Sequence, residues 1–197
     1  MNEIFETSGG LRFIVDLYRH AIVTLTEQEK ETYRKIGYDR HHAKGNNFAD
    51  ATRLYADHPE KEDEIGAIGE GAFSKLTGLE MNADITVVGD SGIDFTFIHS
   101  RDDRPVTVAI SIAQKPNNLF MRAETTNGRT HAEIWVLSGI SADWLSVIFL
   151  GYRTREFMLT RPVVPARHGA MAAEGRKNHE CHHSKLLPMP QLLRAIK

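Results

Sequence analysis

The spacing of hydrophobic residues along this chain changes near residue 80. Before that point apolar residues recur every three or four positions, and after it they alternate at every second position. The first spacing is typical of amphipathic helices, and the second is typical of strands with one buried face. The chain therefore predicts a helical first part followed by a sheet.

Capping residues support the helical interpretation of the first part. Thr26 is followed three residues later by Glu29, the pattern of a capping box, in which each side chain bonds the backbone N–H of the other residue. Gly78 follows an apolar helical stripe and suits a C-terminal helix stop. Helices are expected over residues 11–23, 26–45, 49–56 and 62–77.

The second part of the chain predicts strands. Residues 92–99 and 105–113 alternate apolar and polar positions on either side of the short loop 100–104, which is typical of a hairpin. Helices followed by neighbouring strands favour an α+β fold with a mixed sheet. Further strands are expected over residues 83–88, 119–123, 133–137, 144–151 and 179–184, with a loop over 161–177 and a short helix over 192–196.

Composition bounds the class of protein. A chain of 197 residues with a net charge of −2 suits one globular domain, and its single cysteine excludes an internal disulfide framework. No apolar run reaches the length of about 18 residues that a membrane span needs, and the N-terminus lacks the basic start and apolar core of a signal peptide. We therefore expect a soluble, cytoplasmic protein without a membrane partner.

The small net charge conceals a division along the chain. Residues 56–103 hold 12 acidic and 3 basic groups, whereas residues 104–197 hold 6 acidic and 13 basic groups. An acidic segment can gather metal ions and a basic segment can contact phosphates, although solvated faces explain such clusters equally well.

Three short motifs follow one another in an order that resembles the PD-(D/E)XK nuclease superfamily, and in particular its small phage-type members. They are GAIGEGAFSKLTGLE at 66–80, GIDFTFI at 92–98 and HHSKLLPM at 182–189. The resemblance implies a restriction-endonuclease-like mixed sheet flanked by helices over residues 62–190. A helical extension over 1–61 and a tail over 191–197 complete the expected organisation.

The resemblance also implies a metal-dependent chemistry. Glu70 and Asp94 are expected to bind Mg²⁺ or Mn²⁺, with the backbone carbonyl of Ile110 as an additional ligand, because hard cations take oxygen ligands. Lys115 is expected to orient water or to stabilise developing charge. The implied activity is hydrolysis of DNA phosphodiesters, in the cytoplasm of a bacterial or phage-infected cell.

One strand departs from the superfamily pattern. The face expected to display an acid and a lysine two residues apart displays Ala109 and Ser111, which neither bind a divalent ion strongly nor carry a positive charge. The nearest substitutes are Gln114 and Lys115 at the end of that strand. The alternative is therefore a catalytically inactive module on the same fold that binds nucleic acid or a protein partner.

Each acidic candidate also has an ordinary structural explanation. Glu70 lies off the apolar stripe of its helix, so it is also explained as a solvated residue, although the glycines on either side of it suggest a close backbone approach. Asp94 is also explained as a residue that starts a strand, and Asp90 in the preceding turn is its rival. Lys115 precedes a proline and is also explained as a plain loop lysine.

The basic segment carries the candidate nucleic-acid contacts. Arginine binds phosphate well, and the interleaved Tyr152 and Phe157 offer rings for stacking, although a solvated face with core aromatics is the simpler alternative. A second basic segment lies on the predicted helix over 26–45. The candidate contacts are Arg153, Arg155, Arg161, Arg167, Arg176 and Lys177.

A last cluster contains imidazole and thiol groups. His179, Cys181 and His183 would share one face of a strand, and these groups are good zinc ligands. No second cluster of cysteine and histidine lies nearby in the sequence, so zinc is not expected, and an edge strand with half-exposed histidines is the favoured interpretation. The sequence leaves a homodimer open.

Overall fold

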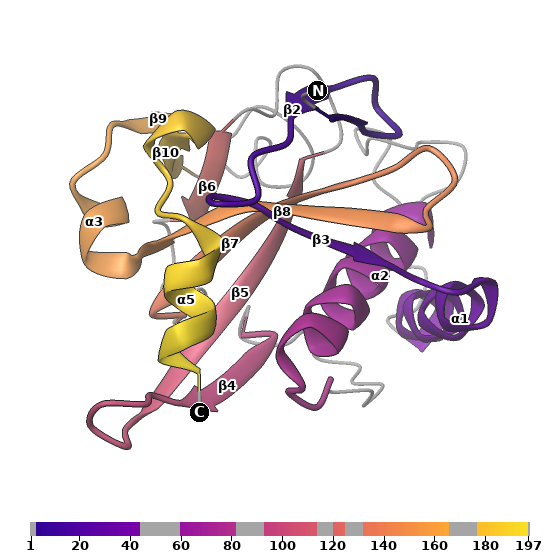
Figure 1. Ribbon diagram of the computed structural model, residues 1–197, viewed down its shortest axis with the longest axis horizontal. Coiled ribbons are helices and arrows are strands. Elements are labelled where there is room, and N and C mark those ends of the chain that lie inside the picture. The colour runs from indigo at the N-terminus through magenta and orange to yellow at the C-terminus, as the bar shows by residue number, and fades with distance from the viewer. Residues whose placement is uncertain are drawn as a thin grey trace.

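The computed structural model describes residues 3–43, 60–81, 93–113, 120–124, 132–165 and 177–196, and Figure 1 shows its elements. The helices are α1 (Glu27–Ala43), α2 (Glu60–Thr77), α3 (Arg155–Leu159) and α5 (Met189–Ala195), with the short 3₁₀ helix η2 (His183–Lys185). The strands are β1 (Ile4–Glu6), β2 (Arg12–Ile14), β3 (Ala21–Thr24), β4 (Phe95–Ile98), β5 (Pro105–Ala113), β6 (Phe120–Glu124), β7 (Ile134–Ile140), β8 (Ser146–Thr154), β9 (Val163–Pro165) and β10 (Lys177–His182).

The central sheet contains five strands in the order β3-β8-β7-β5-β4. β5 and β7 run parallel, with Val108 opposite Ile134, and the other neighbouring pairs are antiparallel. Two smaller sheets accompany it, the β1–β2 hairpin and a three-stranded sheet in the order β6-β10-β9. The expected α+β fold with a mixed sheet is therefore confirmed.

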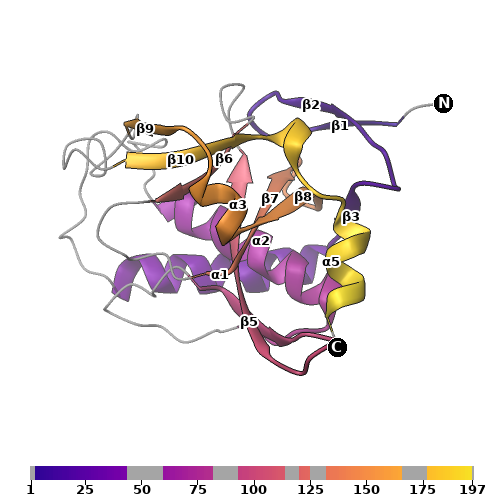
Figure 2. The ribbon, with the colours of Figure 1, turned by 90° about the vertical axis from the view of Figure 1, so that its left-hand side faces the viewer.

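The central sheet is covered on both faces. On one face, α2 and α5 pack against alternate residues of β5, β7 and β8, such as Val108, Val136 and Phe149. On the other face, the β1–β2 hairpin and the three-stranded sheet cover residues such as Trp135 and Leu150. Figure 2 shows these two small sheets above β7 and β8 of the central sheet, and α1 and α2 below those two strands. Because β7 is buried on both faces, it is apolar along most of its length.

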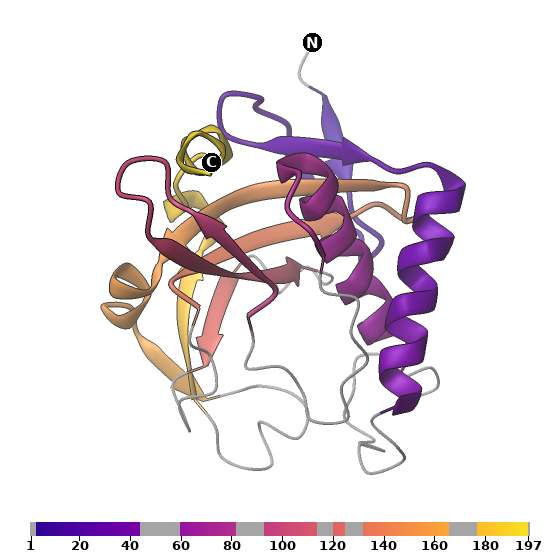
Figure 3. The ribbon, with the colours of Figure 1, turned by 90° about the horizontal axis from the view of Figure 1, so that it is seen from below.

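Helix α1 packs against α2 on the side away from the sheet, as Figure 3 shows. It is a highly charged helix with only one buried residue, Gly37. Interhelical ion pairs join the two helices. They are Glu29 with Lys75 (2.8 Å), Arg34 with Glu64 (3.2 Å), Arg40 with Glu70 (2.8 Å) and His41 with Asp63 (2.8 Å).

The expected start of α1 and the expected end of α2 are confirmed. The hydroxyl of Thr26 accepts a hydrogen bond from the N–H of Glu29 (3.2 Å), and the Glu29 carboxylate accepts one from the N–H of Thr26 (2.7 Å), as a capping box requires. Gly78 follows the last residue of α2 with φ of +74°, a conformation that glycine adopts easily. The hairpin of β4 and β5 is also confirmed.

The helix expected over residues 11–23 is wrong, because this segment forms β2, a loop and β3. β3 pairs with β8, placing Val23 opposite Val147, so its structure depends on a partner that is distant in sequence. The segment expected as a helical extension, 1–61, therefore supplies an edge strand to the central sheet.

The C-terminal part also differs from the expectation. Residues 163–165, expected within a loop, form β9, and β10 ends at His182, two residues earlier than expected. The expected tail boundary at 191 falls inside α5, whose Met189 and Leu192 are buried in the core. The helix expected over 49–56 and the strand expected over 83–88 lie outside the described residues.

Among the helices that the structure describes, none is long and apolar enough to cross a membrane.

The contact between α1 and α2 generates a stability prediction. A Cβ added at Gly37 would lie 2.5 Å from the carbonyl oxygen of Asp63 and 2.5 Å from the Cα of Glu64. Because backbone atoms cannot yield as a flexible side chain can, we expect Gly37→Ala to lower the free energy of unfolding by about 1–3 kcal/mol.

Gly66→Ala is the matched control, because a Cβ at Gly66 in α2 would meet nothing within 4 Å. That substitution should raise the free energy of unfolding by up to about 1 kcal/mol through helix propensity. Urea denaturation followed by circular dichroism measures both variants, and a stabilising effect of both would contradict the close approach of the helices.

Candidate functional site

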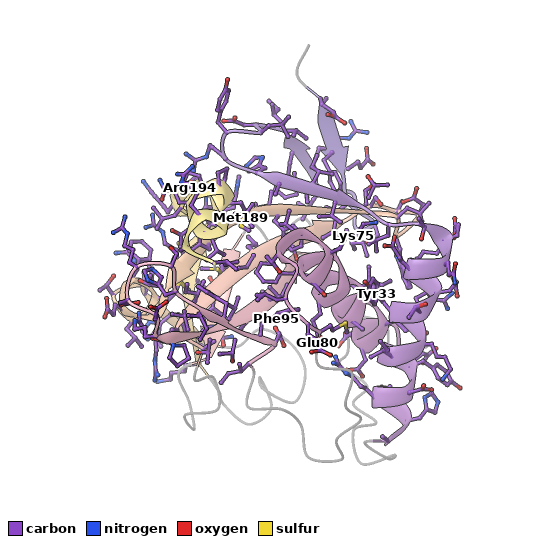
Figure 4. All side chains as sticks on the ribbon, turned by 60° about the horizontal axis from the view of Figure 1, so that its bottom comes forward. Tyr33, Lys75, Glu80, Phe95, Met189 and Arg194 are labelled. Carbon is purple, nitrogen blue, oxygen red and sulfur yellow. The ribbon has the colours of Figure 1, made fainter. Side chains whose placement is uncertain are left out.

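Glu70 lies on a turn of α2 that is tightly packed on two sides. A Cβ added at Gly69 would lie 2.5 Å from Cδ1 of Ile112 in β5, and one added at Gly71 would overlap the ring of Tyr33 in α1. Tyr33 and Lys75 lie between the two helices in Figure 4. The close backbone approach that the flanking glycines suggest is thus confirmed, and its partners are a strand and a helix of the core.

The Glu70 carboxylate forms an ion pair with Arg40 of α1. The distance between Oε2 of Glu70 and Nη1 of Arg40 is 2.8 Å, and the two side chains are 14% and 17% exposed. The interpretation of Glu70 as a solvated residue is therefore wrong. Low exposure strengthens such a charge-assisted hydrogen bond, since competing water is largely excluded.

Asp94 lies directly before β4, beside the adjacent strand β5. Its backbone N–H donates to the carbonyl of Val108 (2.9 Å), and its Oδ2 accepts a hydrogen bond from the N–H of Ile110 (2.6 Å). The pairing of β4 with β5 begins at Phe95 opposite Val108, so the Asp94 carboxylate satisfies a backbone N–H of β5 that lies beyond the end of β4. This geometry agrees with the interpretation of Asp94 as a residue that starts a strand.

Asp94 and the turn of α2 next to Glu70 both contact β5. Gly69, next to Glu70, packs against Ile110 and Ile112, and Asp94 bonds the backbone of Ile110. The contact with β5 is made by Gly69, whereas the Glu70 carboxylate itself pairs with Arg40 of α1. The other residues expected at this site, Asp90, Gln114 and Lys115, lie outside the described part of the chain.

The donor set of these residues does not fit a divalent cation. Glu70 is paired with a guanidinium, and the N–H of Ile110, a group that cannot bind a cation, faces Asp94. Within the described ranges, no group of three or more histidine, cysteine, aspartate and glutamate side chains is placed to hold a metal. A hard cation needs several oxygen ligands at one point, and the described residues supply too few.

Ala109 and Ser111 belong to the interior of the fold. Ala109 is buried in the core cluster on the face of the sheet opposite α2, together with Trp135 and Leu137. The carbonyl of Ser111 accepts a hydrogen bond from the hydroxyl of the fully buried Ser138 (3.2 Å). An acid at position 109 would therefore place its charge on a face of β5 that this chain packs into the core.

Two of the expected phosphate-binding arginines meet at one ring. The guanidinium carbons of Arg153 and Arg161 lie 3.8 Å and 4.5 Å from the centre of the Phe157 ring. Burial raises the pKa of the nearby Cys181 thiol, and the positive charges of Arg153, Arg161 and Lys185 oppose that rise. The guanidiniums of Arg153 and Arg161 therefore meet at the Phe157 ring.

The turn that follows β10 holds Arg153 in place. Nη2 of Arg153 donates to the carbonyl of Lys185, and its Nε is buried without a hydrogen-bond partner among the described residues. Tyr152 and Leu187 exchange two backbone hydrogen bonds (3.1 Å and 2.9 Å), which fasten this turn to β8. We call Arg153, Phe157, Arg161 and Lys185 the η2 basic surface.

The remaining basic candidates do not join this surface in the described structure. Arg155 lines a separate cavity of about 360 Å³ together with Arg104, Glu133 and Tyr152. Lys177 is exposed at the start of β10, opposite Pro165. Arg167 and Arg176 lie outside the described residues.

The cluster of His179, Cys181 and His183 is a packing feature. β10 lies between β6 and β9, so the expectation of an edge strand is wrong, and His179 and Cys181 are buried. Nδ1 of His179 contacts the carbonyl oxygen of Arg161 (2.8 Å), and His183 lies beyond the strand in η2. Burial raises the pKa of the Cys181 thiol, which opposes formation of a nucleophilic thiolate.

Sequence reasoning missed a basic cluster beside η2. Arg12, Arg19 and His20 line one cavity with His183 and Ser184. His183 and Ser184 lie more than 160 positions after the other three residues, which belong to a segment expected as a helix. Their assembly depends on the docking of the N-terminal segment, and no spacing in the sequence indicates it.

The pair of Arg40 and Glu70 generates a second stability prediction. Arg40→Gln and Glu70→Gln should each lower the free energy of unfolding, because each removes one charge of a poorly exposed ion pair. The double variant should lose less than the sum of the two, with a coupling of about 1–3 kcal/mol. Urea denaturation of the four proteins measures this coupling, and additive losses would show that the ion pair contributes nothing.

Comparison of the chain with known proteins identifies no related family, protein or structure. No protein-family model matches the chain, and neither a curated protein nor a solved structure does. The resemblance to the PD-(D/E)XK superfamily therefore stays a prediction that rests on residues and on their order along the chain.

Proposed function

We propose that this protein binds DNA through backbone phosphates at the η2 basic surface. The observation that carries the proposal is the convergence of Arg153 and Arg161 on the ring of Phe157, next to the turn after β10 that contains Lys185. Arginine is suited to this role, because its planar fork of donors matches the geometry of a phosphate. These contacts best support the alternative that the sequence leaves open, a catalytically inactive module that binds nucleic acid.

The geometry of the surface favours phosphates over bases as ligands. Arg153 is held by a backbone carbonyl on one side and by an aromatic ring on the other, so its orientation is set before a ligand arrives. Contacts to phosphate position a protein on nucleic acid without reading its sequence. We therefore expect binding with a strong salt dependence and little sequence preference.

Metal-dependent hydrolysis of DNA is the second candidate. The observation that favours it is the position of Asp94 beside Ile110 of β5, under the turn of α2 that carries Glu70. A bound Mg²⁺ or Mn²⁺ would polarise a phosphodiester and lower the pKa of its water. The pairing of Glu70 with Arg40 and the scarcity of oxygen ligands among the described residues place this candidate second.

The binding proposal predicts the effect of removing single charges. Arg161→Gln and Lys185→Gln should each weaken binding of a duplex with 5′-hydroxyl ends. Each should also reduce the slope of log K against log salt by about 1, the value expected for one lost phosphate contact. Fluorescence anisotropy from 50 to 200 mM salt measures both quantities.

Arg101→Gln is the matched control, since this exposed arginine lies in the turn between β4 and β5 and should leave the slope unchanged. An unchanged slope in both test variants would overturn the assignment of the surface, and absence of salt-dependent binding by the unmodified protein would overturn the function.

The two candidates differ in the expected effect of Asp94→Asn. Under the binding proposal, purified protein does not cleave DNA in Mg²⁺ or Mn²⁺, and the variant binds DNA as tightly as the unmodified protein. Metal-dependent cleavage that Asp94→Asn abolishes, in a variant whose unfolding transition is retained, would establish hydrolysis instead. If the unmodified protein and Asp94→Asn cleave DNA equally, the cleavage comes from a contaminating nuclease, because the variant lacks an expected metal ligand.

A further inference from the structure

A second basic site lies beside the η2 basic surface, on the N-terminal side of η2. It is a cavity of about 550 Å³ between β2, the loop that follows it and η2. Its apolar neighbours are Phe13 and Ile14, and its polar lining comes from Arg12, Asp16, Arg19, His20, His183 and Ser184. The site shares no side chain with the η2 basic surface.

Two guanidiniums line this cavity with donors to spare. Nη2 of Arg19 donates to the carbonyl of Leu186 (3.0 Å), and Nε of Arg12 forms an ion pair with the Glu6 carboxylate (2.8 Å). These are the hydrogen bonds of the two groups within the described part of the chain. Since a guanidinium carries five N–H donors, most of them remain for a ligand.

One of the two imidazoles, that of His20, is arranged as a donor. Nδ1 of His20 accepts a hydrogen bond from the backbone N–H of Asp16 (3.2 Å), which leaves the proton of the neutral ring on Nε2. The ring of His183 packs edge-on against Phe13, with 5.7 Å between ring centres. The Asp16 side chain accepts a hydrogen bond from the N–H of Tyr18 (2.9 Å), so the one acid of the lining is already engaged.

We propose that this cavity binds a phosphomonoester dianion. The two guanidiniums match a doubly charged group, the imidazoles add neutral donors, and Phe13 and Ile14 border the part of the ligand that carries the phosphate. The phosphate comes either from the 5′ end of a nucleic-acid strand or from a free phosphorylated metabolite. The proposal does not rest on the proposed DNA binding, because it uses a different set of side chains.

The surroundings of the imidazoles make binding depend on pH. Burial lowers the pKa values of both His20 and His183. The pKa of His183 is also lowered by His182, His20 and Arg19, and that of His20 is lowered by Arg19 and raised by Asp16. Arg12 is the remaining charged group of the lining. Both rings are thus neutral at pH 7, and a bound dianion raises both pKa values, so binding takes up protons and strengthens as pH falls.

Sulfate separates this effect from the titration of phosphate itself, because sulfate keeps its double charge from pH 8 to pH 6. We expect its affinity to rise measurably over this range, because a bound dianion favours the protonated form of both rings. NMR titration should move the ring signals of His20 and His183, identified with His20→Gln and His183→Gln. Arg12→Gln should weaken binding at least about threefold, whereas Arg101→Gln, at a distant exposed position, should not.

The two sources of phosphate are distinguished by competition. Tighter binding of a 5′-phosphorylated oligonucleotide than of the same strand with a 5′-hydroxyl would identify a strand end. Displacement of sulfate by a mononucleotide but not by the phosphorylated strand would identify a free metabolite. Unmoved signals of both histidines with sulfate, inorganic phosphate and the phosphorylated strand would overturn the site. Binding of the 5′-hydroxyl duplex, which tests the DNA-binding proposal, does not depend on this outcome.

Discussion

The packing of α2 between a sheet and a second helix is the constraint on which the rest of the structure depends. Gly69 lets the backbone of α2 approach Ile112 of β5, and Gly71 lets it approach Tyr33 of α1. A larger residue at either position would have to push one of these layers away. The same turn carries Glu70, so the position and the partner of this carboxylate follow from the packing of the helix.

Pairing of charges between α1 and α2 explains much of the uneven charge distribution along the chain. Three acidic groups of α2, Asp63, Glu64 and Glu70, face basic groups of α1, and Lys75 reverses the pattern by meeting Glu29. In the acidic segment 56–103, for which the sequence suggests metal binding, these carboxylates instead hold the charged helix α1 against α2. The η2 basic surface lies in the basic C-terminal half, whose cations outnumber its acids.

Local signals in the sequence predict some elements well. The capping box at Thr26, the stop at Gly78 and the hairpin of β4 and β5 depend on residues a few positions apart, and all three are confirmed. β1, β2 and β3 are missed, because strands of three or four residues are set by their pairing partners and have too few side chains for a periodic signal. The apolar residues between positions 11 and 23 therefore resemble a helical stripe although they belong to a hairpin, a loop and an edge strand.

The sequence by itself determined the helix caps, the hairpin, the α+β class and the order in which Glu70, Asp94 and the arginines follow one another. Only the tertiary structure decided which of these groups meet. It paired Glu70 with Arg40, placed Asp94 on the backbone of Ile110, and separated Arg155 from Arg153. It also joined Arg19 to the turn after β10, a contact between residues 167 positions apart. Side-chain chemistry and local spacing can be read along the chain, whereas the neighbours of a charge depend on how distant segments pack.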